Sequence, residues 1–416
     1  MDAPPPTLDR LEQRLARVGP WVALLLAAGG LAFLVGRNVV REAAERQGDT
    51  RIYQVAGERY RDGANIYTYE PRYERGGKER ITDYSYPPPF AAVCAAWMPS
   101  LPYRAVRAVW LVVCVACAVA TCALALGLLR RHGLPRRPWL LGLLLLPFLI
   151  RFGWNDLIHG QVNWVVALLL TGAIALSAER RRDPWTGALL GLALVIKPTA
   201  WPLLAWWLLE RRWRLAGACA LAGGLALALP GLRYGPGEYA LLLRDWVVLM
   251  EDFARWKSPG LGNASLGSAF VHLLVGVSRS ARPPEPLLLS LPLDAVLPWV
   301  RGLSLAVGVA LLAACWRWRR ADPRVPPALL VVGALVSPVT WKAHLVVLVA
   351  PALWALRPLA DGAAGRRGWV GYGAALLLFV ASSPSTLGLS TLDALGGLAL
   401  GLGLLLRASL AGALDR

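Results

Sequence analysis

The stretch "PWVALLLAAGGLAFLVG" at residues 20–36 decides the class of fold. It is an unbroken apolar run, long enough to cross a hydrocarbon core of about 30 Å. It follows Arg10, Arg14 and Arg17 and ends at Arg37 without a small-residue cleavage site. We therefore interpret it as a retained signal anchor that leaves residues 1–19 in the cytoplasm.

Similar apolar runs recur along almost the whole chain, and the composition agrees with them. Of 416 residues 56% are hydrophobic and 17% are charged, and the mean hydropathy is +0.48, values typical of a membrane protein. We predict an all-α polytopic integral membrane protein with a single membrane-embedded domain at residues 20–407, about twelve transmembrane helices and a cytoplasmic C-terminus at 408–416. The expected spans lie near residues 20–36, 104–130, 138–151, 161–178, 185–197, 199–210, 214–231, 294–316, 325–338, 343–356, 368–382 and 389–407.

The basic residues set the expected orientation. The net charge is +18, but most arginines fall in short loops between apolar runs, at 130–137, 180–182, 211–214, 317–324 and 357–367, so a nucleic-acid partner is not expected. Short basic loops belong in the cytoplasm. The remaining polar segments then face outward together: 38–103, which carries arginines of its own but is long enough to translocate regardless of charge, 151–164, 197–201, 232–293, 337–344 and 382–390.

Cysteine and histidine spacing predicts neither a metal site nor a bound cofactor. The six cysteines all lie in apolar runs, and the four histidines are isolated from one another and from carboxylate spacings typical of zinc sites. The chain also contains no Asp-x-Asp, no Walker loop and no Gly-x-Gly-x-x-Gly at a strand-to-helix turn.

The first outer segment, 38–103, divides into two parts. Residues 49–61 place Ile52, Val55, Ala56 and Tyr60 at helical spacing, which predicts an amphipathic helix on the membrane surface with Asp49 at or near its N-cap. Residues 86–103 are apolar but short and bounded by prolines, so we expect a re-entrant or interfacial segment.

The second long outer segment, 232–293, contains "RDWVVLMEDFARWKSPG" at 244–260. Its aromatic residues, Trp246, Phe253 and Trp256, alternate with basic ones. This pattern fits an amphipathic helix resting on lipid headgroups, or else one wall of a groove for a lipid or an acceptor. The Asn-x-Ser at Asn263 is interpreted as a chance sequon.

Several short motifs carry a resemblance. They are "DTRIY" at 49–53, "GANIY" at 63–67, "YPP" at 86–88, "GQVNW" at 160–164, "IKPTAWPLL" at 196–204 and "SPVTWKAH" at 337–344. In this order, and over residues 20 to 360, they resemble the bacterial polyprenyl-phosphate-mannose-dependent mannosyltransferases of glycosyltransferase family 87, which belong to the GT-C superfamily of multi-span enzymes. Residues 70–85 are longer and more charged than the family pattern, which leaves the acceptor open.

The resemblance implies an inverting mannosyltransferase, and the outward-facing loops point the same way. Nucleotide sugars do not occur outside the cytoplasmic membrane, so a lipid-linked donor, a polyprenyl-phosphate sugar, is expected there. Its phosphate leaves readily, and one carboxylate suffices to take the proton from the attacking acceptor hydroxyl. Direct displacement by that hydroxyl inverts the anomeric centre.

Candidate residues follow from these motifs. Asp49 matches the family's catalytic aspartate, although a helix N-cap explains it from the pattern alone; Asp156 is the second candidate. Lys197, Lys342 and His344 are expected to bind the donor phosphate, with lysines that snorkel to the interface as the alternative. Gln161 and Asn163 are expected to bind sugar hydroxyls, or to tie helices together. Further candidate substrate-binding residues are Asp156, His159, Tyr53 and Tyr86.

The expected partners are the polyprenyl-phosphate sugar donor, a lipid or envelope-glycan acceptor and the membrane itself. The expected location is the bacterial cytoplasmic (inner) membrane, with the active site on its extracytoplasmic face. A transporter or flippase of lipid-linked or small solutes is the alternative function, because about twelve spans are also common in carriers. A transporter, however, should have its ionisable groups near the bilayer midplane, whereas in this sequence they gather at the outer ends of the predicted spans.

Overall fold

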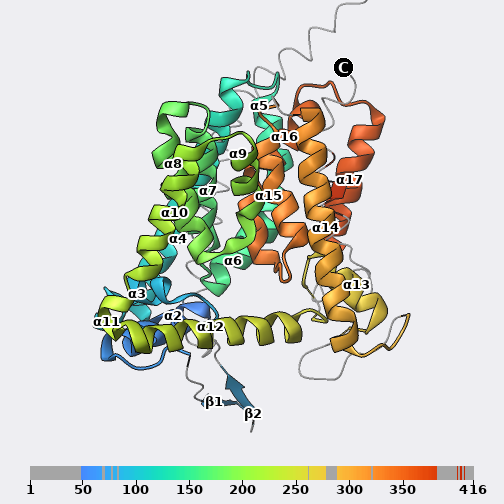
Figure 1. Cartoon of the computed structure of the whole chain (residues 1–416). Coiled ribbons are helices and arrows are strands. Elements are labelled where there is room, and N and C mark those ends of the chain that lie inside the picture. Colours follow the sequence, from blue (N-terminus) through green and yellow to red (C-terminus); the bar gives the residue numbers. More distant parts are fainter. Residues whose placement is uncertain are drawn as a thin grey trace, which may run out of the picture.

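Long helices standing side by side form most of the molecule, and shorter elements gather at one end of them (Figure 1). The structure is a computed structural model. It describes residues 48–67, 71–75, 78–81, 84–260, 262–277, 288–319, 322–381, 401, 403, 404 and 407. The predicted span at 20–36 and both predicted cytoplasmic termini lie outside these residues, as does almost all of the predicted span at 389–407.

The helices of the bundle follow the apolar runs closely. Their bounds are α4 Tyr103–Arg131, α5 Pro138–Phe148, α6 Trp154–His159, α7 Asn163–Leu176, α8 Asp183–Ile196, α9 Trp201–Leu209, α10 Trp213–Ala228, α14 Leu293–Arg319, α15 Val325–Val336, α16 Val349–Ala360 and α17 Arg366–Ala381. In the described residues five helices are long and apolar enough to cross a bilayer: Tyr103–Arg131, Pro138–His159, Trp213–Tyr234, Leu293–Arg317 and Lys342–Ala360. A helical membrane protein is therefore confirmed, whereas the number twelve is not.

The elements at the end of the bundle come from the two segments predicted to face outward. They are α2 Asp49–Asp62, α3 Pro88–Ala95, α11 Gly231–Tyr234, α12 Pro236–Lys257 and α13 Leu266–Leu274. Figure 1 shows α12 lying across the ends of the long helices. The strands β1 Pro71–Arg75 and β2 Lys78–Ile81 form an antiparallel hairpin, so the prediction of an all-α chain was wrong here. Turn-flanked strands of this length are too short to show a clear alternation in the sequence.

Glycines let α8 and α10 approach closely. A Cβ at Gly191 or Gly187 would collide with backbone atoms of α10, at Cys219 and Leu215. Small residues one turn apart allow such contacts between membrane helices. Because α8 begins at Asp183, which pairs with the buried Arg212 just ahead of α10, the two helices are held both by this ion pair and by backbone packing.

A π-helical turn at Leu149–Gly153 joins α5 to α6, behind Pro147. Such turns occur frequently at functional sites, because they change the direction in which the following side chains point. A Cβ at Gly153 would lie 3.0 Å from the Trp164 ring, so this glycine lets α6 pack against α7. The turn thereby directs Asp156, on α6, into the protein, where it is fully buried.

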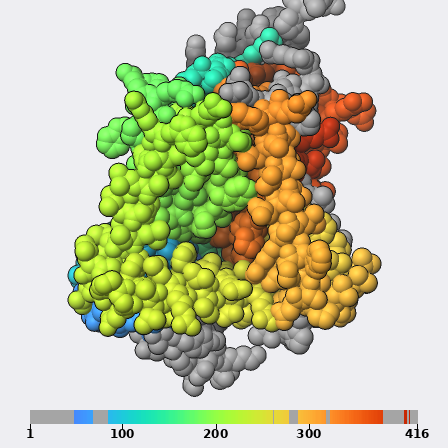
Figure 2. Space-filling model, in the orientation of Figure 1, coloured from blue at the N-terminus to red at the C-terminus, as the bar shows by residue number. Residues whose placement is uncertain are grey.

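The helix α12 presents two different sides. Leu241, Val247, Val248 and Trp256 are exposed, as expected for a helix on lipid headgroups. Trp246, by contrast, donates a hydrogen bond of 3.5 Å to the Ser85 carbonyl, which joins α12 to the segment before α3. Figure 2 shows the molecular surface hollowed between α10 and α14, directly above α12. Both interpretations of this segment therefore have a feature that fits them.

Candidate active site

Asp49 is the first residue of α2, and its carboxylate is not used for capping. The N-cap is Gly48, which makes no side-chain capping bond. The half-buried Asp49 instead accepts a hydrogen bond from Gln161 and lies within the electrostatic reach of His159 and Lys197. Asp49 therefore lies directly after the N-cap, as near it as predicted, but the capping role was wrong: Gly48, in an extended conformation, is the N-cap, and the carboxylate is available.

Burial raises the pKa of Asp49 above its ordinary value of 3.8, while the charges of His159 and Lys197 oppose this rise. A carboxylate in this state binds a proton more strongly than one in water, which suits a general base that must take a proton from a hydroxyl. The electrostatics of the position therefore fit proton abstraction.

Two glycines hold the start of α2 against the loop after α6. A Cβ at Gly48 would lie 2.8 Å from the His159 carbonyl oxygen, and a Cβ at Gly160 would overlap the Thr50 hydroxyl. Gly160 also has a φ of +65°, a left-handed conformation that glycine adopts without strain. Its carbonyl accepts a 2.8 Å hydrogen bond from the Trp110 indole. The "HGQ" sequence therefore places Gln161 beside Asp49.

A chain of hydrogen bonds links the predicted polar residues behind Asp49. Lys197 donates to the Asn163 amide oxygen at 2.5 Å. The Asn163 amide nitrogen donates to Asp156 Oδ2 at 2.6 Å and to Gln161 Oε1 at 2.8 Å. Residues from α6, α7 and the end of α8 thus meet at one point, and Lys197 reaches it from 34 residues further along the chain.

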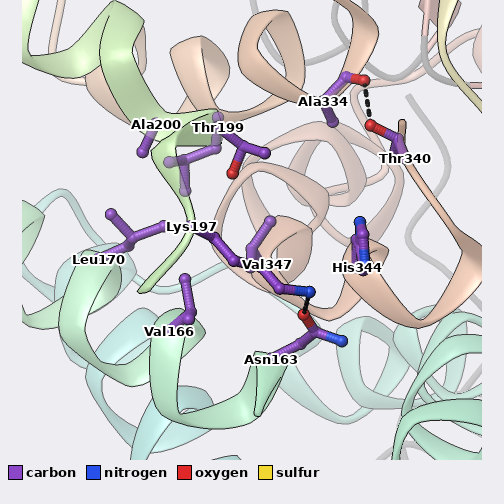
Figure 3. Close-up of a pocket in the computed structure, with 11 residues that line it drawn as sticks. Asn163, Val166, Leu170, Lys197, Thr199, Ala200, Ala334, Thr340, His344 and Val347 are labelled. Atoms are coloured by element: carbon purple, nitrogen blue, oxygen red, sulfur yellow. Dashed lines mark hydrogen bonds between the residues drawn. The ribbon is translucent and has the colours of Figure 1, made fainter. Parts of the chain in front are cut away.

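A pocket opens beside this chain, and Lys197, Asn163 and His344 face it together (Figure 3). It is lined by Asn163, Val166, Leu170, Lys197, Thr199, Ala200, Leu330, Ala334, Thr340, His344 and Val347. The lining is apolar apart from a few converging polar groups, as is common in small-molecule sites. The Lys197 ammonium, the His344 imidazole and the Thr199 hydroxyl in this lining suit an anionic group such as a phosphate, whereas the Thr340 hydroxyl donates to the Ala334 carbonyl.

The hydrogen bond at His344 determines which of its nitrogens carries the proton. The backbone N–H of Trp341 donates to His344 Nδ1 at 3.3 Å. Because Nδ1 is the acceptor, the proton of the neutral ring lies on Nε2. We therefore describe His344 as a neutral donor rather than as the cation that the sequence suggested.

His159 lies at the exposed edge of the site. Its Nδ1 is 2.7 Å from the Asn155 carbonyl oxygen, so Nδ1–H donates a hydrogen bond to that oxygen. The other ring nitrogen, Nε2, is then available for a hydrogen bond on the side toward solvent. Its exposure and its interaction with Asp49 fit the predicted contact with substrate.

Other predicted residues occupy less direct positions. Tyr53 is 0% exposed, and its hydroxyl donates to the Tyr86 hydroxyl at 3.1 Å inside an aromatic cluster with Phe90. The Lys197 ammonium lies 5.4 Å from the centre of the Tyr86 ring. These tyrosines fit the task of holding α2 and Lys197 in place better than direct contact with a substrate. The fully buried Asp156 likewise reaches the site only through Asn163.

Lys342 is separate from the pocket that Lys197 and His344 line. It is buried, and its Cε would lie 3.9 Å from a Cβ at Gly262, so it packs against the loop before α13. The sequence placed Lys342 beside His344, but the short helix Lys342–Leu348 turns the two side chains in different directions.

The sequence analysis missed Thr199, Thr340 and Asn263. The two threonines line the pocket, and both stand inside the motifs "KPTAW" and "SPVTWKAH". The buried Asn263 accepts the Thr340 N–H at 2.9 Å and donates to the Pro338 carbonyl at 3.1 Å. A polar residue between small residues in a loop has no recognisable sequence pattern. Only these hydrogen bonds reveal that Asn263 fixes the conformation of the motif "SPVTWKAH".

Comparison with known proteins gives one family. The model of glycosyltransferase family 87 matches residues 84–341, a range that includes every residue of the pocket except His344 and Val347, which follow it. Asp49 and α2 lie ahead of the matched range. No curated protein and no solved structure matches the chain.

Proposed function

Because the chain belongs to glycosyltransferase family 87, we propose that it moves a mannosyl group from a polyprenyl-phosphate donor to an acceptor hydroxyl, with inversion. The acceptor is a lipid or an envelope glycan, and the reaction takes place on the extracytoplasmic face of a bacterial cytoplasmic membrane. The observation that carries this proposal is that Lys197 interacts electrostatically with Asp49 and also lines the pocket with His344, which places a base near a pocket suited to an anion. The family favours transfer over the alternative of a transporter.

In the proposed reaction Asp49 accepts the proton of the acceptor hydroxyl. The acceptor oxygen then forms a bond to the anomeric carbon on the face opposite the phosphate, and the bond from that carbon to the phosphate oxygen breaks. Its electron pair stays on the phosphate, which leaves as polyprenyl phosphate. Lys197 and the Nε2–H of His344 stabilise the charge that develops there.

The polar groups of the site match this division of work. Gln161 holds the carboxylate of Asp49 by a hydrogen bond, and His159 at the exposed edge is suited to an acceptor hydroxyl. The hollow between α10 and α14, above α12 (Figure 2), supports lateral entry of a lipid-linked substrate. Exposed apolar residues on α12 would rest against the same lipid surface.

The experiment is a transfer assay with purified protein in lipid nanodiscs. Radiolabelled polyprenyl-phosphate mannose and a lipid extract are added, and a new labelled glycolipid is sought; its anomeric configuration should be opposite to that of the donor. Asp49→Asn should lower the rate by about 10²- to 10⁴-fold, the usual contribution of a general base. The protein should still fold, because Asn occupies the same volume.

The matched control is Asp62→Asn, the same substitution at the exposed far end of α2. It should transfer at the parent rate. Asp49→Asn with a rate close to that of the parent would remove Asp49 from the mechanism. If a glycolipid formed only from a donor that carries another sugar, the assignment of mannose would be wrong, but the assignment of glycosyl transfer would stand.

A further inference from the structure

Asn163 lies between the two halves of the site, and both donors and one acceptor position of its side-chain amide are bonded to protein groups. It is 1% exposed. Its amide oxygen accepts from Lys197, and its amide nitrogen donates to Asp156 and Gln161. A side chain so occupied has little capacity left for a sugar hydroxyl, the role suggested by the sequence. Its position points to a different task.

The orientation of this amide is determined by charge. Turned by 180°, it would present its NH₂ group to the Lys197 ammonium and its oxygen to the Asp156 carboxylate, and both contacts would be repulsive. Asp156 is 0% exposed, and within the described part of the chain its other oxygen, Oδ1, has no hydrogen-bond partner. The buried carboxylate therefore acts on the site through Asn163.

The same amide also determines the orientation of Gln161. Because Gln161 Oε1 accepts from Asn163, its NH₂ group is left to donate to Asp49, with which it forms a hydrogen bond. Lys197 on the phosphate side and Asp49 on the base side are thus connected by Asn163 and Gln161. A change in the Asn163 amide should be felt at both ends.

We propose that Asn163 is a positioning residue that orders the phosphate-binding side and the base side of the site together, and that the buried carboxylate of Asp156 sets the orientation of its amide. This inference rests on the proposed function. It adds a coupling: the group that holds the donor phosphate and the group that takes the acceptor proton depend on one side chain.

The test measures the two sides separately. The dissociation constant of geranylgeranyl phosphate reports on the phosphate side, and kcat for mannosyl transfer at saturating donor reports on the base side. Asn163→Ala should weaken geranylgeranyl phosphate binding about tenfold and lower kcat about tenfold, the effect of losing the hydrogen bond from Lys197 on one side and the hydrogen bond that orients Gln161 on the other. Gln161→Ala should lower kcat and leave the dissociation constant near that of the parent.

An exchange variant, Asp156→Asn combined with Asn163→Asp, separates positioning from simple packing. It retains the volumes, the total charge and an acceptor for Lys197, so the protein should fold and bind geranylgeranyl phosphate nearly as the parent does. The new carboxylate cannot donate to Gln161, however, and draws its NH₂ group away from Asp49. We therefore expect kcat to remain about tenfold lower in the exchange variant.

The matched control is Thr171→Val, an isosteric change on the same helix α7 at a buried hydroxyl that has no hydrogen-bond partner in the described residues. It should leave both quantities unchanged. Asn163→Ala with parent values of both quantities, or an exchange variant with full kcat, would overturn the inference. The proposed function fails separately, if the parent protein forms no labelled glycolipid in the same assay; an active Asp49→Asn would remove Asp49 from the mechanism without failing the transfer itself.

Discussion

The helix α8 has a charged group at each end, buried at its start and half-buried at its end, and the two groups are paired in different ways. At its start Asp183 pairs with Arg212, whose Nε lies 3.0 Å from Oδ1, and both side chains are 5% exposed. At its end Lys197 donates to the neutral amide of Asn163, while the carboxylates of Asp49 and Asp156 act on it electrostatically. Because α8 has 14 residues, its two ends are about 21 Å apart.

The difference distinguishes a structural ion pair from a site prepared for a ligand. Arg212 presents two nitrogens to one carboxylate, a geometry that satisfies both charges inside the protein. An ammonium has three donors, and Asn163 accepts one of those of Lys197. The first arrangement is complete without a partner from outside, whereas the second leaves hydrogen-bonding capacity directed at the pocket.

The largest effect is expected from breaking the first pair. Asp183→Leu leaves the Arg212 guanidinium buried without its counter-charge, which typically costs about 3–5 kcal/mol. The melting temperature in detergent should fall sharply, while the folded fraction should bind geranylgeranyl phosphate like the parent. Glu179→Gln, which removes an exposed partner of Arg181, is the control and should melt like the parent. An equally stable Asp183→Leu would show that the pair does not hold α8.

The opposite result is expected at the other end of α8. Lys197→Met removes the ammonium but keeps a chain of similar length, so geranylgeranyl phosphate should bind about 10- to 100-fold more weakly, the range for hydrogen bonds to a charged group. The melting temperature should change little, because a buried charge that must be desolvated is removed at the same time. Unchanged binding in titrations would show that Lys197 is not part of the phosphate site.

The ends of the molecule can also be compared through the backbone of two glycines that have positive φ. Gly160 has a φ of +65° and Gly362 a φ of +71°. A Cβ added at Gly160 would collide with Thr50, whereas a Cβ added at Gly362 would have no other atom within 4 Å. Each substitution by Ala should cost about 1–2 kcal/mol for the left-handed conformation. Gly160→Ala should in addition move α2 from Gln161 and lower the transfer rate, and Gly362→Ala should not. Equal transfer rates in the two variants would contradict the importance of the α2 contact.

The smallest effect concerns the pH dependence of Asp49. Its pKa in the folded protein is raised by burial above 3.8, so the folded state binds the proton more strongly than the unfolded state. The contribution of Asp49 to stability is therefore greatest below pH 3.8 and is lost as the pH rises through the folded pKa. Asp49→Asn should melt slightly higher than the parent at neutral pH, and this advantage should shrink as the solution is acidified.

The same shift predicts the pH profile of transfer. A base must be deprotonated, so kcat/KM should fall on the acid side through the pKa of Asp49 in the free protein, above the ordinary range of an aspartate. A profile of kcat/KM that stays level down to pH 3.8 would contradict this prediction. The stability prediction would be contradicted if the difference in melting temperature between Asp49→Asn and the parent stayed the same in acid.

Much of the site could be predicted because its residues lie in short motifs. Asp49, Gln161, Asn163, Lys197 and His344 come from different outward-facing segments, and the structure brings them together. Roles were harder to assign than positions. The structure buries Tyr53 and Asp156 behind the site and separates Lys342 from the pocket, because the direction of a side chain depends on helix rotation and on the π-helical turn, which no local pattern records.

By itself the sequence determined that this is a helical membrane protein, where its apolar helices run, and which family of enzymes it belongs to. These properties follow from hydrophobic length and from motifs that are read along the chain. Only the tertiary structure decided that Gly48, and not Asp49, is the N-cap of α2, and that Asn163 joins Lys197 to Gln161. Such features depend on contacts between different helices or on the packing of one backbone against another, and their energies arise only when the helices are assembled.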